Sequence, residues 1–160
     1  DLERVVALER KKVELEEGME EKAGVDAADP IAPAPVGRSS VADIDATASF
    51  YRDVLGMEVV EFPVADGTRR KALRFGAQKI DLHTAAAPFK PHAANPTPGS
   101  ADLCLLTKTP LADWQSHLHA AGIAIEAGPI ARTGATGPLM SIYLRDPDGN
   151  LIEVSIQNPL

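Results

Sequence analysis

The segment "RDPDGNLIEVS", residues 145–155, predicts a turn followed by a strand that carries an acid in its middle. Asp, Pro and Gly favour turns, and the run after them is rich in the aliphatic residues of strands. Glu153 stands among these aliphatic residues. An ionised carboxylate in an apolar setting is costly unless it is paired, hydrogen-bonded or bound to a metal. The segment therefore predicts a specific partner for Glu153.

This strand closes the second of two similar halves, because the order helix, strand, strand, strand occurs twice after residue 40. The predicted elements are a helix at 41–56 and strands at 57–64, 70–76 and 79–84, then a connection with four prolines at 85–100, a strand at 101–107, a helix at 109–122 and strands at 123–128, 139–146 and 150–157. Gly56 and Gly122 end the two helices and align without gaps. The same alignment of the two halves matches Asp81 of "KIDLH" with Glu153 of "LIEVS".

Acids recur at related positions of these strands. Asp81 and His83 share one face of their strand, since alternate residues point the same way. Asp102, on the strand that opens the second half, points away from its aliphatic neighbours. A single acid in a strand is more often on a solvated face or bonded to an amide, but acids that converge repel one another unless a cation neutralises them. The set Asp81, Asp102 and Glu153 therefore predicts a bound divalent metal, with oxygen ligands that suit Mg, Mn or Fe(II).

The composition limits the class of protein. With 160 residues, 44% of them apolar and 24% charged, the chain is long enough for one globular domain and an appendage. The net charge of -7 and the scattered Lys and Arg residues argue against a nucleic-acid partner. A single cysteine excludes an internal disulfide, and no apolar run is long enough to cross a membrane. No secretory signal is evident, so we expect a soluble, cytoplasmic protein whose partner is a small molecule.

The first 35 residues differ from the rest in pattern. Residues 1–24 carry Val5, Leu8, Leu15 and Met19 at helical spacing before Gly24, which predicts a helical arm. A mostly solvated helix is one interpretation, and a helix added to a dimer interface is the other. Residues 25–35 are rich in Ala and Pro and are expected to form an extended linker.

The duplicated unit and its ending "RDPDGNLIEVS" resemble the vicinal oxygen chelate superfamily, which includes glyoxalase I, bleomycin-binding proteins and extradiol dioxygenases. The strings "KALRFGAQKIDLH", "NPTPGSADLC", "GPIARTGATGP" and "MSIYLRDPDGNLIEVS" are similar to glyoxalase domain-containing proteins and their bacterial lactoylglutathione-lyase-like relatives. The resemblance implies an α+β fold in which paired βαβββ modules, at 36–84 and 101–157, form a cup-shaped mixed sheet around a divalent metal. It also implies a homodimer.

The resemblance implies a ligand set as well. Glu153 matches the glutamate of the last strand, a metal ligand and the natural base. Asp102 matches the first strand of the second module, and Asp81 matches the last strand of the first module, with His83 as the competing candidate. The remaining ligand of the relatives is a histidine, and Val36 stands at its position. The metal is expected to be Mg, Mn, Fe, Ni or Zn.

Two functions remain open on this reading. The first is a metal-dependent glyoxalase-like enzyme, a lyase or a related enzyme, that acts on a small oxygenated substrate with Glu153 as its base. The alternative is a non-catalytic protein that sequesters a small molecule, as bleomycin-binding members do, with an impaired metal site.

Three other features carry weaker expectations. The stretch "ARTGATGP", residues 131–138, is either a flexible hairpin connection or a loop in which Arg132 meets an anionic group of the substrate. Cys104 is expected to be a small core residue. His117 and His119 should point to different faces of their helix and share no metal.

Overall fold

The computed structural model describes residues 36–157, which belong to one compact unit. The predicted arm and linker, residues 1–35, lie outside the described residues, so they stay predictions. Within residues 36–157, neither helix is long and apolar enough to span a membrane.

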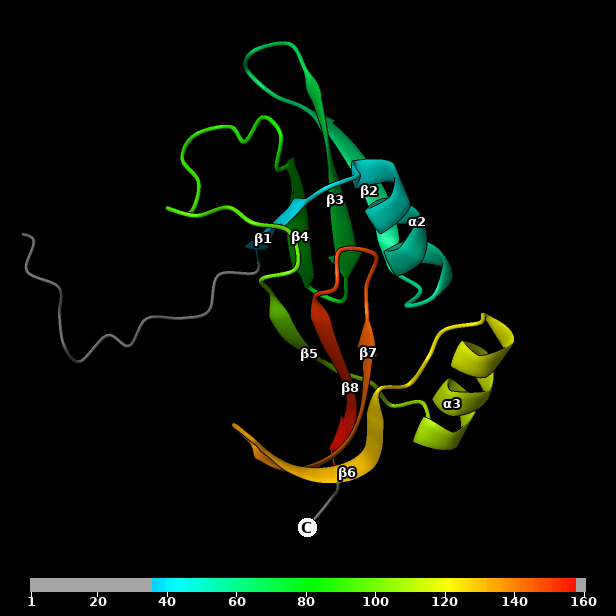
Figure 1. Cartoon of the computed structure of the whole chain (residues 1–160). Coiled ribbons are helices and arrows are strands. Elements are labelled where there is room, and N and C mark those ends of the chain that lie inside the picture. Colours follow the sequence, from blue (N-terminus) through cyan, green and yellow to red (C-terminus); the bar gives the residue numbers. More distant parts are fainter. Residues whose placement is uncertain (1–35, 158–160) are drawn as a thin grey trace, which may run out of the picture. The chain divides into compact units, whose positions relative to one another are not determined.

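Two modules follow one another in the chain, each with one helix and four strands (Figure 1). The elements are β1 (Val36–Val41), α2 (Ile44–Asp53), β2 (Glu58–Pro63), β3 (Arg69–Phe75), β4 (Gln78–Thr84), β5 (Asp102–Leu106), α3 (Leu111–Ala120), β6 (Ala127–Gly134), β7 (Gly137–Arg145) and β8 (Leu151–Gln157). They form two mixed sheets with the strand orders β1-β4-β3-β2 and β5-β8-β7-β6, and only the β1–β4 and β5–β8 pairs are parallel. This confirms the predicted α+β fold of paired βαβββ modules.

The internal repeat is visible in the strand register. Val36 pairs with Lys79 in the first sheet, and Asp102 pairs with Leu151 in the second. Asp81 and Glu153 each follow two residues after these partners. The two acids therefore occupy equivalent places in the two modules, as the alignment of the halves predicts.

Local sequence signals explain where the helices begin and end. The Asp43 carboxylate caps α2 by accepting hydrogen bonds from the amides of Asp45 and Ala46, at 2.8 and 2.9 Å. Gly56 and Gly122 follow the two helices with φ of 70° each, in the left-handed region that favours glycine. Both predicted helix stops are confirmed.

One predicted strand is wrong. Residues 123–126 form a connection rather than a strand, and β6 begins at Ala127 and runs through the first half of "ARTGATGP", to Gly134. The alternation of Ile123 and Ile125 has another cause, because both side chains pack against the core from this connection. Arg132 therefore lies on a strand rather than in a loop.

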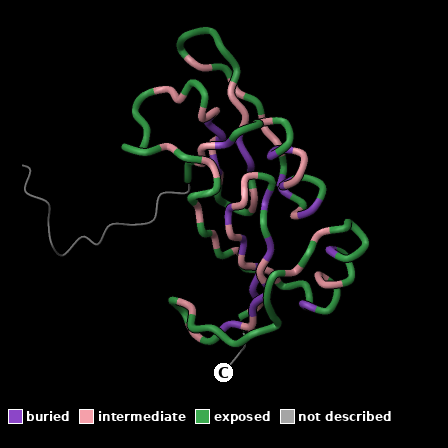
Figure 2. The backbone as a smooth tube through the Cα atoms, in the orientation of Figure 1, coloured by how far each residue is buried: buried purple, intermediate pink, exposed green. Residues whose placement is uncertain are grey.

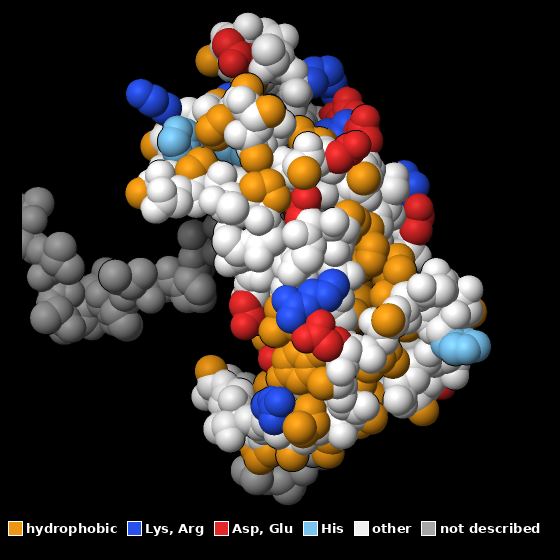
Figure 3. Space-filling view, viewed as in Figure 1, with side chains coloured by type: hydrophobic (Ala, Val, Ile, Leu, Met, Phe, Trp, Pro, Cys, Tyr) orange, Lys and Arg blue, Asp and Glu red, His pale blue; other side chains and the backbone are white. Residues whose placement is uncertain are grey.

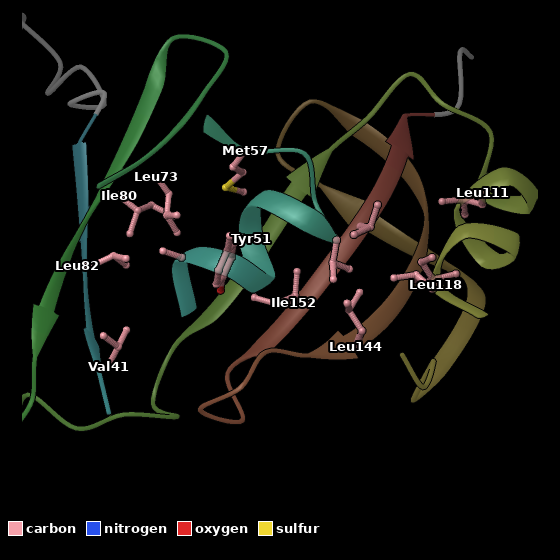
Figure 4. Packing of buried hydrophobic residues seen from close by; sticks show 14 residues of the cluster. Val41, Tyr51, Met57, Leu73, Ile80, Leu82, Leu111, Leu118, Leu144 and Ile152 are labelled. Carbon is pink, nitrogen blue, oxygen red and sulfur yellow. The ribbon is translucent and has the colours of Figure 1, made fainter. Parts of the chain in front are cut away.

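Side chains from both sheets pack into one hydrophobic cluster. Leu73, Ile80 and Leu82 come from the first sheet, and Ile142, Leu144, Ile152 and Val154 from the second, with Tyr51, Leu111 and Leu118 from the helices (Figure 4). Buried segments accordingly follow the strands and helices of both modules in Figure 2. Since strand residues alternate between faces, each sheet has an inner face in this shared core and an outer face directed away from it.

The turn before β8 joins the two modules through a buried carboxylate. Asp146, 6% exposed, accepts a hydrogen bond from the hydroxyl of Tyr51 on α2 at 3.0 Å and another from the side-chain amide of Asn150 at 2.8 Å. The backbone amides of Asp148 and Asn150 donate to its other oxygen. Burial, and then the nearby Asp146, raise the pKa of Tyr51, so its hydroxyl remains a donor.

Further bonds from the same turn reach the starts of both modules. The Asp148 carboxylate accepts a hydrogen bond from the amide of Ala42, just after β1, at 3.1 Å. Asn150 accepts from the amide of Ala101, just before β5, at 2.8 Å. Gly99 passes close to the turn, since a Cβ there would lie 2.5 Å from the carbonyl oxygen of Asp148. The segment that predicted the fold is therefore a structural connection between the modules.

Replacing Tyr51 with Phe should lower the free energy of unfolding by about 1 to 3 kcal/mol, because it removes a buried hydrogen bond to a carboxylate. Urea denaturation measures this. Tyr143→Phe is the control, with an expected change within about 0.5 kcal/mol, because its hydroxyl is bonded to an exposed arginine. Equal losses in the two variants would contradict the assigned role of Asp146.

Candidate functional site

The predicted site residues lie on the outer faces of the two sheets. Ile80, Leu82, Ile152 and Val154 occupy the inner faces, so the alternate residues Asp81, His83 and Glu153 point outward. Because the inner faces share one core, the outer faces of one chain are turned away from each other. Within residues 36–157, no three His, Cys, Asp or Glu side chains are placed to hold one metal ion. One chain therefore brings together only parts of the predicted ligand set.

Glu153 is half-buried on the outer face of the second sheet, with Cys104 of β5 and Tyr143 of β7 as its neighbours in the register. Its carboxylate accepts a hydrogen bond from the hydroxyl of Ser155 at 3.2 Å. Ser155 in turn shares a 2.8 Å hydrogen bond with Ser141, and both serines are fully buried. These bonds fix the position of the carboxylate.

Glu153 has no basic partner within ion-pair distance in the described part of the chain. The same holds for Asp102, which is exposed on β5 and pairs with Leu151, two residues before Glu153. These two acids are available to bind a cation, and Glu153 is available to accept a proton.

Arg132 approaches the same outer face through Tyr143. Its Nε donates a 2.8 Å hydrogen bond to the Tyr143 hydroxyl, and a guanidinium nitrogen donates to its own neighbour, the carbonyl oxygen of Ala131. Tyr143 stands opposite Glu153 on the adjacent strand. Tyr143 therefore lies between Arg132 and Glu153, and these two side chains are not bonded to each other.

The first module presents different chemistry around Asp81. The ammonium of Lys79, on the same strand and face, lies 2.9 Å from Asp81 Oδ1. The contact is an ion pair, because its angles are not those of a hydrogen bond. The ammonium already neutralises one oxygen of this carboxylate, so Asp81 fits a metal less well than Asp102 or Glu153 does.

His83 is 2% exposed and is covered by an aromatic ring. The centre of the Phe89 ring, from the proline-rich connection, lies 3.7 Å from the centre of the imidazole. The guanidinium carbon of Arg70 lies 3.0 Å from the centre of the same Phe89 ring. The Nε2 atom of His83 has no hydrogen-bond partner among the described residues. Burial, and then the charge of Arg38, lower the pKa of His83.

Cys104 corrects one expectation from the sequence. The cysteine is exposed on the outer face of β5, because Leu103 and Leu105 are the residues that pack against the core. Its sulfur lies 3.6 Å from the hydroxyl of Ser155. The alternation of apolar residues could have revealed this position, since a residue between two inward leucines must point outward.

Two further histidines lie on α3, and two basic residues lie near Asp81. His117 donates from Nε2 to the carbonyl oxygen of Val54 at 2.9 Å, and His119 is exposed, in line with their expected separation. The sequence reading did not single out Lys79 or Arg38. Lys79 stands two residues before Asp81, so the period of a strand could have placed them on one face. The position of Arg38 beside Asp81 follows only from the register of β1 against β4.

Cys104 should report on the charge of Glu153. Partial burial of the thiol group raises its pKa, and the neighbouring Glu153 adds to this, so alkylation at neutral pH should be slower than that of free cysteine. Glu153→Gln should accelerate alkylation by iodoacetamide a few-fold by removing the negative charge, as measured by mass spectrometry of protein sampled at timed intervals. Glu126→Gln, whose carboxylate is bonded to Arg145, is the control. Equal rates in both variants would show that Cys104 and Glu153 do not share a face.

Known proteins are similar in sequence to this chain. The virulence protein STM3117 of Salmonella typhimurium is 57% identical over 116 residues, which cover 72% of this chain and 78% of that protein. The glyoxalase domain-containing protein RDO1 of Mycosarcoma maydis is 53% identical over 113 residues, 71% of this chain and 61% of that protein. This chain thus spans less than two thirds of the fungal relative.

Solved structures share the fold. The crystal structure of STM3117 superposes with a TM-score of 0.75 at 51% identity and covers 81% of this chain and all of that one, 100%. A lactoylglutathione lyase from Agrobacterium tumefaciens, 24% identical with a TM-score of 0.58 over 79% of this chain and 95% of its own, shows likeness of fold alone. The family model that matches residues 36–154 describes the Glyoxalase/Bleomycin resistance protein/Dioxygenase superfamily. The chain belongs to this superfamily.

Proposed function

We propose that this protein is a glyoxalase-like enzyme, a lyase or a related enzyme, that acts on a small oxygenated substrate. The observation that carries the proposal is the carboxylate of Glu153. It is held in place by Ser155, faces away from the core and has no basic partner among the described residues. A fixed carboxylate of this kind suits a general base that removes a proton from carbon.

A divalent metal is part of the proposal, with Asp102 and Glu153 as the acids that fit it best. When bound, such an ion would polarise the oxygens of the substrate and stabilise the negative charge that develops when the proton leaves. Asp81 is a weaker candidate because Lys79 is already paired with it, and His83 is weaker because Phe89 covers its ring. Two oxygen ligands favour Mg, Mn or Fe(II), and Ni or Zn remain in the set to be tested.

The proposal includes a homodimer, because one chain presents its two outer faces in different directions. A second copy would let the outer face of one module meet the outer face of the other module across the pair. Two features support such pairing. β1 and β5 each end a sheet and have one edge without a strand partner among the described residues, and Leu106 on β5 is 61% exposed. The substrate-binding cup would then lie between chains, with Arg132 at its edge. We place this activity in the cytoplasm.

A second candidate function is sequestration of a small molecule without chemistry. Two features favour it: Val36 stands where the resemblance expects a histidine ligand, and Lys79 neutralises Asp81. The same cup would then bind its ligand without a metal.

Turnover of the hemithioacetal of methylglyoxal and glutathione, with each of the five metals added in turn, tests the enzyme. We expect activity with at least one metal, and Glu153→Gln should lower kcat by about 10² to 10⁴-fold because it removes the base. Glu126→Gln is the matched control on the same module and should retain full activity.

A failure of the test would also be informative. No turnover with any of the metals, in protein that retains a small molecule through purification, would contradict the enzyme and favour sequestration. Full activity of Glu153→Gln would contradict the role of this carboxylate even if turnover were observed.

A further inference from the structure

The outer face of the first module carries an excess of positive charge in a chain whose net charge is -7. Arg38 of β1 pairs with Asp81 of β4 in the register, and Lys79 lies on the same face as Asp81. Arg74 is compensated on this face by Glu58, with which it forms an ion pair. Elsewhere on the visible surface, acidic and basic side chains lie beside one another, as along α2 and β3 in Figure 3.

Two guanidinium groups on this face are poorly neutralised. Arg38 is exposed and has no hydrogen bond or ion pair with the described residues. Arg70 has only a distant carboxylate, that of Asp66 at 3.9 Å, and its guanidinium lies against the ring of Phe89. Arg70 contacts the Phe89 ring that covers His83, and Arg38 pairs with Asp81, two residues before His83 on β4, so both groups lie near the buried imidazole.

His83 supplies an independent indication of a ligand. Its side chain is almost fully buried on this face, yet its Nε2 atom has no partner in the described part of the chain. Buried polar atoms nearly always have a hydrogen-bond partner, so an orphan atom near an unpaired and a weakly paired guanidinium group indicates a group that the protein binds. Phe89 excludes water from one side of the imidazole, which strengthens any charged contact there.

We propose that Arg38, Arg70 and His83 bind the carboxylate of a small molecule that also carries a flat apolar group, which would pack against the edge of Phe89, because His83 and Arg70 occupy the faces of that ring. Guanidinium groups donate in a fork that matches the two oxygens of a carboxylate, and the imidazole supplies a further N–H. A neutral carbonyl would accept fewer and weaker hydrogen bonds and would leave the positive charge without a counterion. This inference rests on the proposed function in one respect: the carboxylate would be the end of the substrate that points away from Glu153.

Benzoate is a suitable probe, because it combines a planar carboxylate with an aromatic ring, and benzamide is its neutral counterpart. The full chain, freed of metal with a chelator, is titrated with each and followed by amide chemical shifts. We expect saturable shifts in β1, β3 and β4 with benzoate and none with benzamide. Arg38→Gln should weaken benzoate binding by about tenfold or more, and Arg74→Gln, on the same face but paired with Glu58, should not change it.

Several results would overturn the inference: no saturable shift with benzoate, equal binding of benzamide, shifts confined to the second module, or equal losses in Arg38→Gln and Arg74→Gln. His83→Gln gives a second check, since its side-chain amide retains a donor and should keep more affinity than His83→Phe. The amide spectra of the variants show whether each is folded. Because the titration uses metal-free protein and no turnover, its outcome is separate from that of the lyase assay.

Discussion

The buried carboxylate of Asp146 is the contact on which the arrangement of the two modules depends. The carboxylate accepts a hydrogen bond from the Tyr51 hydroxyl on α2 of the first module, and its own turn supplies three more donors. A carboxylate removed from water is stabilised by such a complete set of donors, so Tyr51 couples the turn to the first module. The inner faces of both sheets then share one core, and the outer faces point in different directions.

This constraint explains why the acids of the two halves do not meet in one chain. The repeat places Asp81 and Glu153 at equivalent positions, and the shared core turns both away from it. The two positions have nonetheless acquired different surroundings. Within residues 36–157, Glu153 is bonded to a serine and has no basic partner, whereas Asp81 is paired with Lys79 and stands opposite Arg38. The proposed cation site is therefore on one half, and the proposed anion site is on the other.

The sequence predicts most of the fold because its signals are local. Helix stops at Gly56 and Gly122, the alternation in β4 and β8, and the turn before β8 each depend on neighbouring residues. Prediction from the sequence fails where the environment of a residue depends on segments far away in the chain. Ile123 and Ile125 alternate as in a strand but pack from a connection, and the acid of "RDPDGNLIEVS" that is deeply buried is Asp146 rather than Glu153. The sequence reading missed the basic surroundings of His83, since they require the register of β1 against β4 and the position of Phe89.

The central claim is that a complete site lies between two chains, and chemical cross-linking tests it most directly. Cys104 is the one cysteine of the chain and lies on the outer face of the second module. A tagged variant carries Arg38→Cys together with Cys104→Ser and is co-expressed with the unaltered chain. The purified protein is treated with a short bismaleimide, which can link Cys104 of one chain to the cysteine introduced in the other. The account predicts a covalent dimer that contains one chain of each kind. Its absence, in protein whose thiols both react with a single maleimide, would contradict the account.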